Sequence, residues 1–519
     1  MRTDDACHAD DDTHARAARS CTPDVFRREQ LEMGRPRNMN HFPLTDITLV
    51  VPELFMLGMI CAILVIDVFL RDEQRGVTYW LTQASLVGAL ILTLTMDEGT
   101  RRVGLSGTFI ADPLSVLLKS AVYVLTIAVF AYSRRYQESR DLFRGEYFVL
   151  GLAGVLGMMV LISAYSLLTV YLGLELMSLA LYAMVALQRD SGRASEAAMK
   201  YFVLGALASG MLLYGMSILY GLTGTLGMPE IAASLIQQNH PPMAVTFAVV
   251  FVVVGLAFKL GAVPFHMWVP DVYEGAPSSV TLYVGSVTKI AAFAMLLRLL
   301  AEALPSTHAS WGGMLELMVV LSLAVGNVIA IAQTNIKRML AYSTISHVGF
   351  VMLGVLTGTA TGYAAAMFYV LIYALMSAGA FGMVVLLSRK GYEAENLSDF
   401  SGLNERSPWL AFVMLLFMFS MAGVPPTVGF YAKLVVLQSV IQVDQPWLAL
   451  YAVIMSVIGA FYYLRVVKFI YFDKPVTNEP VVTGPVAGAI MSANGLSVLV
   501  LGLFPWVLMS ICAAAAASL

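Results

Sequence analysis

The segment VGLAFKLGAVPFHMWVPDVYEGAP, residues Val254–Pro277, places a lysine, several prolines and a histidine in an otherwise membrane-spanning run. Pro264 has no N–H to donate to the carbonyl of Leu260, so an acceptor is freed beside Lys259, and Gly261 adds flexibility. We therefore predict a broken helix that lines a cavity, as in ion transporters. A helix that simply ends in a proline-rich loop is the alternative.

Composition places this segment in a membrane protein. The 519 residues are 59% hydrophobic and 13% charged, with a mean hydropathy of +0.77, which excludes a water-soluble globular domain. Apolar segments of about 18 to 25 residues recur, so an all-α polytopic fold with about fourteen transmembrane helices is predicted. The predicted spans are 46–70, 78–97, 109–133, 147–163, 165–187, 196–221, 243–263, 276–301, 312–333, 340–358, 362–388, 409–431, 447–470 and 485–511.

Loop charge predicts the orientation, because Lys and Arg are retained in cytoplasmic loops. With the first span starting outside, the outer loops that follow it hold Arg101 and Arg102. The inner loops hold sixteen cations, namely Arg71, Arg75, Arg134, Arg135, Arg140, Arg144, Arg189, Arg193, Lys337, Arg338, Arg389, Lys390, Arg406, Arg465, Lys468 and Lys474. Both termini are therefore expected on the periplasmic side.

Residues 1–38 differ from the rest of the chain. They carry seven arginines and eight acidic residues and no apolar stretch, a composition typical of a disordered segment and unlike a signal peptide. We interpret them as a disordered extension or a misassigned start, with the native product beginning at Met39.

Motifs for redox, nucleotide or hydrolytic chemistry are absent from the sequence. Cys7, Cys21, Cys61 and Cys512 form no CxxC pair, and no GxGxxG or Walker-type loop occurs. No cofactor, metal or nucleic acid is expected to bind this chain. Any chemistry is expected to come from charges inside the membrane.

Four charged residues fall near the middle of predicted spans: Glu175, Lys259, Lys289 and Lys433. A charge at mid-bilayer costs about 2.5 to 3.5 kcal/mol on insertion scales, so such residues are expected to face a wet or paired interior. Lys200 and Lys119 lie nearer span ends. The alternative is that some of these groups form buried ion pairs that only fix packing, or that the lysines reach the interface.

Helical spacing supports an inward-facing polar surface. Tyr171, Glu175, Ser178 and Tyr182 follow one another at i, i+4, i+7 and i+11, which places them on one helix face. Thr281, Gly285 and Lys289 repeat this pattern with Ser278 and Thr288 nearby. Hydroxyl groups beside a charge are what a chain of ordered waters needs. His266, just beyond the predicted break, has a side chain suited to proton relay, although a lone histidine is more often structural.

Two short matches indicate an internal repeat. AAMKYFVLGALASG at Ala197 resembles AAMFYVLIYALMSAG at Ala365, and FKLGAVPF at Phe258 resembles FSMAGVPP at Phe419, at offsets of 168 and 161 residues. Five spans separate the members of each pair, and an odd-numbered repeat must be inverted in the membrane. We therefore predict two inverted five-helix repeats, each containing a broken helix, at Pro264 and at Pro425 with Pro426. The predicted regions are an N-terminal three-helix region 39–146, a first repeat 147–301, a second repeat 312–470 and a last helix 485–511.

These features resemble a known family. YLGLELMSLALYAM, VTKIAAFAMLLRL, NIKRMLAYSTISHVGF and MAGVPPTVGFYAK, together with the opening segment, are similar to motifs of the antiporter-like membrane subunits of respiratory complex I. The resemblance covers about residues 42–511. SVTKIAAFAMLLRL, the position of Lys433 and the lack of a long lateral helix after the last span fit the N type better than the L or M type.

The resemblance implies a proton-translocating subunit of NADH-quinone oxidoreductase in the bacterial inner membrane, a translocase without a redox centre of its own. NADH, FMN, iron-sulfur clusters and quinone, whether ubiquinone or menaquinone, would be handled by other subunits. The implied neighbours are the M- and K-type subunits, then J, A, L and H, in the lipid bilayer.

Carried over by motif, Glu175 pairs with Lys259, Lys289 is the central relay and Lys433 is the outlet lysine. Lys200, His266 and His347 form a second tier. We hypothesise that Lys259 is protonated when Glu175 is near and passes its proton to Lys289 when Glu175 moves away. A sodium/proton antiporter subunit of a multi-subunit cation/proton antiporter and a purely structural scaffold are the rival interpretations.

Overall fold

The computed structural model describes residues 44–237, 241–475, 481 and 483–519. The chain divides into two compact units, Met1–Ile47 and Thr48–Leu519. The predicted extension 1–38 lies outside the described residues, as do Cys7 and Cys21. The second unit contains every membrane-spanning helix described below.

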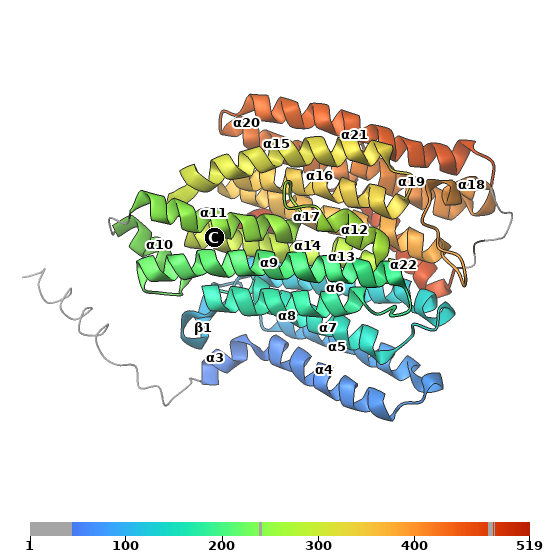
Figure 1. Ribbon diagram of the computed structural model, residues 1–519, viewed down its shortest axis with the longest axis horizontal. Helices are drawn as coiled ribbons and strands as arrows, with labels where there is room; N and C mark the ends of the chain where they lie inside the picture. The colour runs from blue at the N-terminus through green and yellow to red at the C-terminus, as the bar shows by residue number, and fades with distance from the viewer. Residues whose placement is uncertain (1–43, 238–240, 476–480, 482) are drawn as a thin grey trace, which may run out of the picture. The chain divides into compact units, whose positions relative to one another are not determined.

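Helices dominate the second unit, where they lie side by side (Figure 1). Thirteen helices of the described chain are long and apolar enough to cross a membrane. They are α4 Val51–Phe69, α5 Gly76–Thr95, α6 Pro113–Ser139, α7 Gly145–Ile162, α8 Leu167–Val185, α9 Gly192–Thr223, α11 Pro242–Leu260, the continuous Ser278–Ala303 (α13, α14 and η3), Pro305–Ala332 (η4 and α15), α16 Ile336–Leu356, α17 Ala360–Leu387, α21 Pro446–Phe472 and α22 Pro485–Leu503. The all-α polytopic prediction is confirmed.

The remaining span is divided in two. α19 Pro408–Ala422 and α20 Val428–Gln442 are apolar helices of 15 residues each, and together they supply the length of one membrane crossing. The predicted span 409–431 was therefore wrong at its end, because the helix resumes after the prolines. The last predicted span, 485–511, is also divided, since α22 ends at Leu503 and α23 Trp506–Ala516 follows.

Short elements connect the spans. They are α3 Leu44–Leu49, η1 Asp72–Gln74, the antiparallel pair β1 Arg102–Gly104 and β2 Phe109–Ala111 with η2 Leu105–Gly107 between them, α10 Met228–Gln237, α12 Trp268–Gly275, η5 Leu397–Phe400 and α18 Leu403–Arg406. Within the long Ser278–Ala303 span, α13 ends at Ser286, α14 runs from Thr288 to Leu297, and η3, Arg298–Ala303, is a π-helical turn.

Both predicted breaks are present and share one geometry. α11 ends at Leu260 and α19 at Ala422, each capped by a glycine in the left-handed region, Gly261 with φ 83° and Gly423 with φ 89°. A side chain would be strained at such a φ, so glycine suits both positions. Gly423 lies 162 residues after Gly261, one more than the offset that the sequence match gives.

The first two helices of each predicted repeat also pack in the same way. A Cβ on Gly157 of α7 would lie 2.4 Å from the backbone nitrogen of Met177 in α8, and a Cβ on Gly326 of α15 would lie 2.7 Å from that of Ser346 in α16. Glycines let membrane helices approach this closely. The paired contacts and paired breaks fit two five-helix repeats, each with one broken helix.

Replacing Gly157 tests this close packing. Gly157→Ala is expected to destabilise the protein by about 1 to 3 kcal/mol, because backbone atoms of α8 occupy the space of the new methyl group. Gly210→Ala in α9 is the matched control, since a Cβ there meets open space. Thermal unfolding of the purified assembly should show a lower midpoint for Gly157→Ala alone; equal midpoints would contradict the packing described.

Candidate functional site

At the first break, a lysine binds the backbone carbonyl that proline leaves without a partner. Because Pro264 has no N–H, the carbonyl of Leu260 lacks its helical donor, and Lys289 Nζ donates to it at 2.9 Å. Lys289 is 2% exposed, and its Nζ lies 5.2 Å from the centre of the Trp268 ring. The freed acceptor predicted from the sequence is thus occupied by Lys289 of α14, not by the adjacent Lys259.

The second break repeats this interaction. Pro425 and Pro426 leave the carbonyls of Met421 and Ala422 without helical donors, and Lys433 Nζ donates to them at 3.0 and 2.9 Å. A third bond reaches the hydroxyl of Ser456 in α21 at 2.8 Å. Lys433 comes from α20, on the other side of its own break, whereas Lys289 comes from the next span, so non-equivalent positions build the same contact.

Lys259 is a second buried lysine beside the first break. It is 7% exposed, and its Nζ donates to the hydroxyl of Ser178 at 2.8 Å. A cavity of about 10 Å³, lined by both side chains and by Tyr182, has room for roughly one water. Ser178 and Tyr182 are buried, as the spacing on α8 predicts.

Glu175 does not form an ion pair with Lys259 in this structure. Its side chain is half-buried on α8, one turn before Ser178, and within the described part of the chain no hydrogen bond reaches its buried Oε1. An unpartnered buried carboxylate oxygen is unusual and calls for a functional or solvent partner. Ser178 therefore takes the place beside the ammonium group that the family resemblance assigns to Glu175.

A network of hydroxyl groups surrounds His347 in α16. His347 is 3% exposed, and its ring nitrogens lie 2.8 Å from the hydroxyl of Tyr369 and 3.0 Å from that of Tyr463. Tyr463 in turn contacts Ser343 at 2.5 Å. These tyrosines carry no sequence signal of their own, because they come from α17 and α21 and meet His347 only in the fold.

A second hydroxyl contact joins the two repeats near Lys289. The carbonyl of Gly285, one turn before Lys289, accepts hydrogen bonds from Ser377 at 2.8 Å and from Tyr373 at 3.3 Å. Tyr373 also donates to Thr344 at 2.7 Å, and Thr344 lies three residues before His347. Polar groups thus extend from the α13–α14 span toward the second repeat.

The second-tier candidates fall in different places. His266 lies half-buried between α11 and α12, and its buried Nδ1 has no partner among the described residues. Lys200 is exposed and paired with Glu196 and Asp271, each at 2.9 Å, so it belongs to the surface. Lys119 is buried but forms an ion pair with Glu53 at 2.5 Å, consistent with a packing role.

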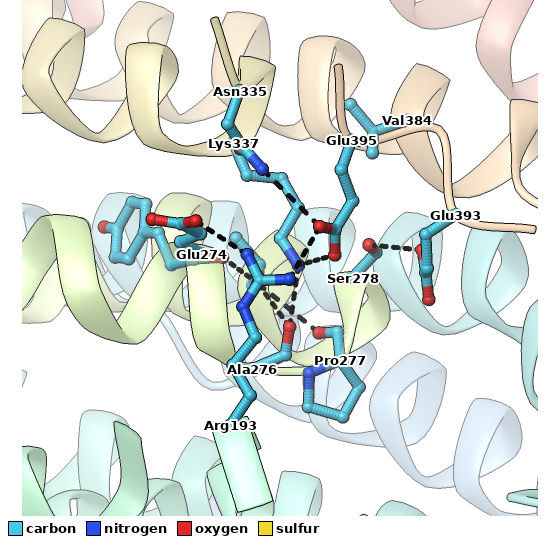
Figure 2. Close-up of polar contacts among 12 residues, drawn as sticks. Arg193, Glu274, Ala276, Pro277, Ser278, Asn335, Lys337, Val384, Glu393 and Glu395 are labelled. Atoms are coloured by element: carbon cyan, nitrogen blue, oxygen red, sulfur yellow. Dashed lines mark hydrogen bonds and ion pairs between the residues drawn. The ribbon is translucent and has the colours of Figure 1, made fainter. Parts of the chain in front are cut away.

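Lys200 is the first member of a chain of alternating charges at one end of the helices, which we call the mouth cluster. It consists of Lys200, Asp271, Arg338, Glu274, Arg193, Glu395 and Lys337, each paired with the next within 3.4 Å. Figure 2 shows Arg193 reaching between Glu274 and Glu395. Lys337 is 1% exposed and also donates to the carbonyl of Ala276 at 2.8 Å.

Glu395 is the acidic residue that links this cluster to the second repeat. Burial opposes ionisation of its carboxyl group, but the charges of Lys337 and Arg193 outweigh burial and hold the pKa of Glu395 below its usual range. Its backbone carbonyl accepts from the N–H of Ile336 at 2.6 Å, so the loop that carries it is fixed to the start of α16.

A further buried charge group was not predicted from the sequence. Arg298 of η3 is 0% exposed and pairs with Asp112 and with Glu302, each at 2.8 Å. Arg101 joins Glu302 at 3.1 Å. The i, i+4 spacing of Arg298 and Glu302 was a usable signal, whereas the pairing with Asp112 joins residues far apart in the sequence.

The arrangement is suited to moving protons. Two buried amines, a half-buried amine and a buried imidazole are surrounded by hydroxyls and freed carbonyls, groups that hold protons and waters in a low-dielectric interior. No group of three or more His, Cys, Asp or Glu side chains that could hold a metal occurs within the described ranges.

Comparison with known proteins shows the family of the chain. Residues 164–459 match the family model described as NADH:quinone oxidoreductase/Mrp antiporter, TM. NADH-quinone oxidoreductase subunit N of Thioalkalivibrio sulfidiphilus is 63% identical over 91% of this chain and 98% of its own. The protein of the same name from Thiobacillus denitrificans is 58% identical over 89% and 95%.

Solved structures show the same fold. A chain of respiratory complex I from Thermus thermophilus with bound Aureothin aligns with a TM-score of 0.77 and 31% identity, covering 90% of this chain and 100% of its own. A chain of the Mrp complex from Dietzia sp. aligns with a TM-score of 0.80 at 22% identity, covering 91% and 97%. At that identity the second likeness concerns the fold alone.

The lowered pKa of Glu395 predicts a pH-dependent stability. Because the folded protein favours the ionised form, Glu395 contributes its stabilisation above its usual pKa, and that contribution is lost as the pH falls through the lowered value. Glu395→Gln should therefore lower the thermal unfolding midpoint most at neutral pH, with the difference shrinking in acid. The exposed Glu405→Gln is the control, and a pH-independent difference for Glu395→Gln would contradict the assignment.

Proposed function

The chain belongs to the subunit N family of NADH-quinone oxidoreductase, and from that premise we propose that it translocates protons as one membrane subunit of respiratory complex I. Electron transfer from NADH to quinone, with FMN and iron-sulfur clusters, would take place in other subunits. The proposed setting is the bacterial inner membrane, with both termini periplasmic and with M- and K-type subunits as neighbours.

The observation that carries this proposal is the pair of lysines, Lys289 buried and Lys433 half-buried, bound to the open ends of broken helices. Lys289 and Lys433 each donate to carbonyls that proline has freed. A lysine in such a site keeps hydrogen-bond partners for its charged form and yet lies away from bulk water, so both protonation states are accessible. A scaffold would not need protonatable groups at both breaks.

We propose a relay in which Lys259, Lys289 and Lys433 hold the proton in turn. Glu175 approaching Lys259 favours the protonated ammonium group by Coulomb attraction, and its withdrawal leaves desolvation to favour proton loss toward Lys289. The position of Glu175 away from Lys259, with Ser178 bound instead, corresponds to the withdrawn state. His347 and its tyrosine partners would connect Lys289 with Lys433. We assign His266 and Lys200 no step.

The sodium/proton antiporter remains the alternative function. It is supported by the likeness of fold to a chain of the Mrp complex, whereas the two relatives that are 63% and 58% identical are named NADH-quinone oxidoreductase subunit N. Coupling of pumping to quinone reduction distinguishes the two functions.

Replacing Lys259 tests the relay. Lys259→Ala and Glu175→Ala are each expected to abolish or sharply lower the protons moved per quinone reduced in membrane vesicles, because the first proton-holding site is lost. The control is the double variant Lys119→Met with Glu53→Gln, which removes a buried lysine and a buried glutamate outside the relay. Pumping at the unmodified ratio in assembled Lys259→Ala complexes would show that the relay is wrong.

A further inference from the structure

α12 is a short helix that is not continuous with the spans before and after it. It covers eight residues, Trp268–Gly275, about 12 Å of helix. The break follows α11 on one side, and on the other Ala276 is extended, with ψ 153°, before Pro277. Since neither neighbouring span continues into it, side-chain contacts must fix its position.

α12 is held by cations from both repeats, through Asp271 in its first turn and Glu274 near its end. Glu274 accepts from Arg193 of α9 at 2.7 Å and from Arg338 of α16 at 2.8 Å. Asp271 accepts from Arg338 at 2.9 Å and from Lys200 of α9 at 2.9 Å. A cavity of about 180 Å³ opens among these side chains. Charge-assisted bonds shared among several partners are the strong kind of surface ion pair.

The junction after α12 is fixed in the same way. Figure 2 shows Lys337 and Arg193 converging on Glu395 beside the carbonyl of Ala276. Lys337 donates to that carbonyl at 2.8 Å and pairs with Glu395 at 3.4 Å. A buried cation at the C-terminal end of a helix also interacts favourably with its exposed carbonyls.

The inner end of α12 carries Trp268, which covers Lys289. The indole N–H donates to the carbonyl of Phe258 at 2.8 Å, and the ring stacks on Tyr201 with centroids 4.5 Å apart. Lys289 Nζ lies 5.2 Å from the ring centre. The position of α12 thus determines whether the Trp268 indole lies against the ammonium group of Lys289.

We propose that Asp271 and Glu274 are positioning residues: by binding Arg193, Lys200 and Arg338 they hold α12 so that Trp268 covers Lys289. Because the cations come from α9 and from α16, a shift of one repeat against the other moves α12 and uncovers Lys289. The mouth cluster thereby couples the relative position of the repeats to access to the central lysine. This inference rests on the proposed function.

The test compares Glu274→Gln and Asp271→Asn with the control Glu196→Gln. Glu196 pairs with Lys200 at 2.9 Å but lies on α9 and is exposed, so the control removes a charge beside the cluster without releasing α12. In the assembled complex, hydrogen–deuterium exchange of the Trp268–Gly275 backbone should rise about tenfold in the two α12 variants, the effect of losing one bond between charged groups. The same variants should move fewer protons per quinone reduced.

The outcomes separate this inference from the relay. The inference would be overturned if the hydrogen–deuterium exchange of α12 did not change in either α12 variant. It would also be overturned if exchange rose while the protons moved per quinone reduced stayed the same, or if Glu196→Gln had the same effects as the α12 variants. If Glu274→Gln does not assemble, Asp271→Asn carries the test, because it leaves Glu274 bound to both arginines. Loss of pumping in Lys259→Ala together with normal pumping in both α12 variants would contradict only the role of α12.

Discussion

The structure depends on one interaction, the hydrogen bond between a lysine side chain and a backbone carbonyl freed by proline. A helix break inside a membrane exposes carbonyls that water cannot reach, and a lysine at the same depth needs partners for its charge. Lys289 at Leu260 and Lys433 at Met421 and Ala422 solve both problems together. The helix breaks and the lysine charges, each unfavourable alone inside a membrane, therefore stabilise each other.

The helix break and most of the membrane spans could be predicted from the sequence. The missing N–H of Pro264 identified the free carbonyl of Leu260, and the hydropathy pattern predicted most of the spans. The pattern at 163–166 also allowed one long span, and the structure shows two helices there, α7 and α8. The pattern did not show which lysine would bind that carbonyl. Lys289 reaches it from another span, 29 residues away, and no local periodicity encodes such a contact.

The polar networks were the least predictable part. His347 meets Tyr463 across 116 residues of sequence, and Arg193 meets Glu395 across 202. Inner-loop arginines such as Arg193 and Arg338 indicated the orientation of the chain by their charge. Their acidic partners in the other repeat, Glu395 for Arg193 and Glu274 for Arg338, could not be predicted. The two repeats also differ at their breaks, since Lys433 has no lysine counterpart at the equivalent position of the first repeat. The residue 162 positions earlier is Asp271, which belongs to the mouth cluster.

Lys289→Arg tests the central claim most directly. Arginine keeps the positive charge and can donate to the carbonyl of Leu260, but it does not lose its proton in proteins. The account predicts an assembled complex with unchanged helix packing in which the protons moved per quinone reduced fall sharply. Pumping at the unmodified ratio would contradict it, because Lys289 would then be needed only as a fixed charge that closes the broken helix.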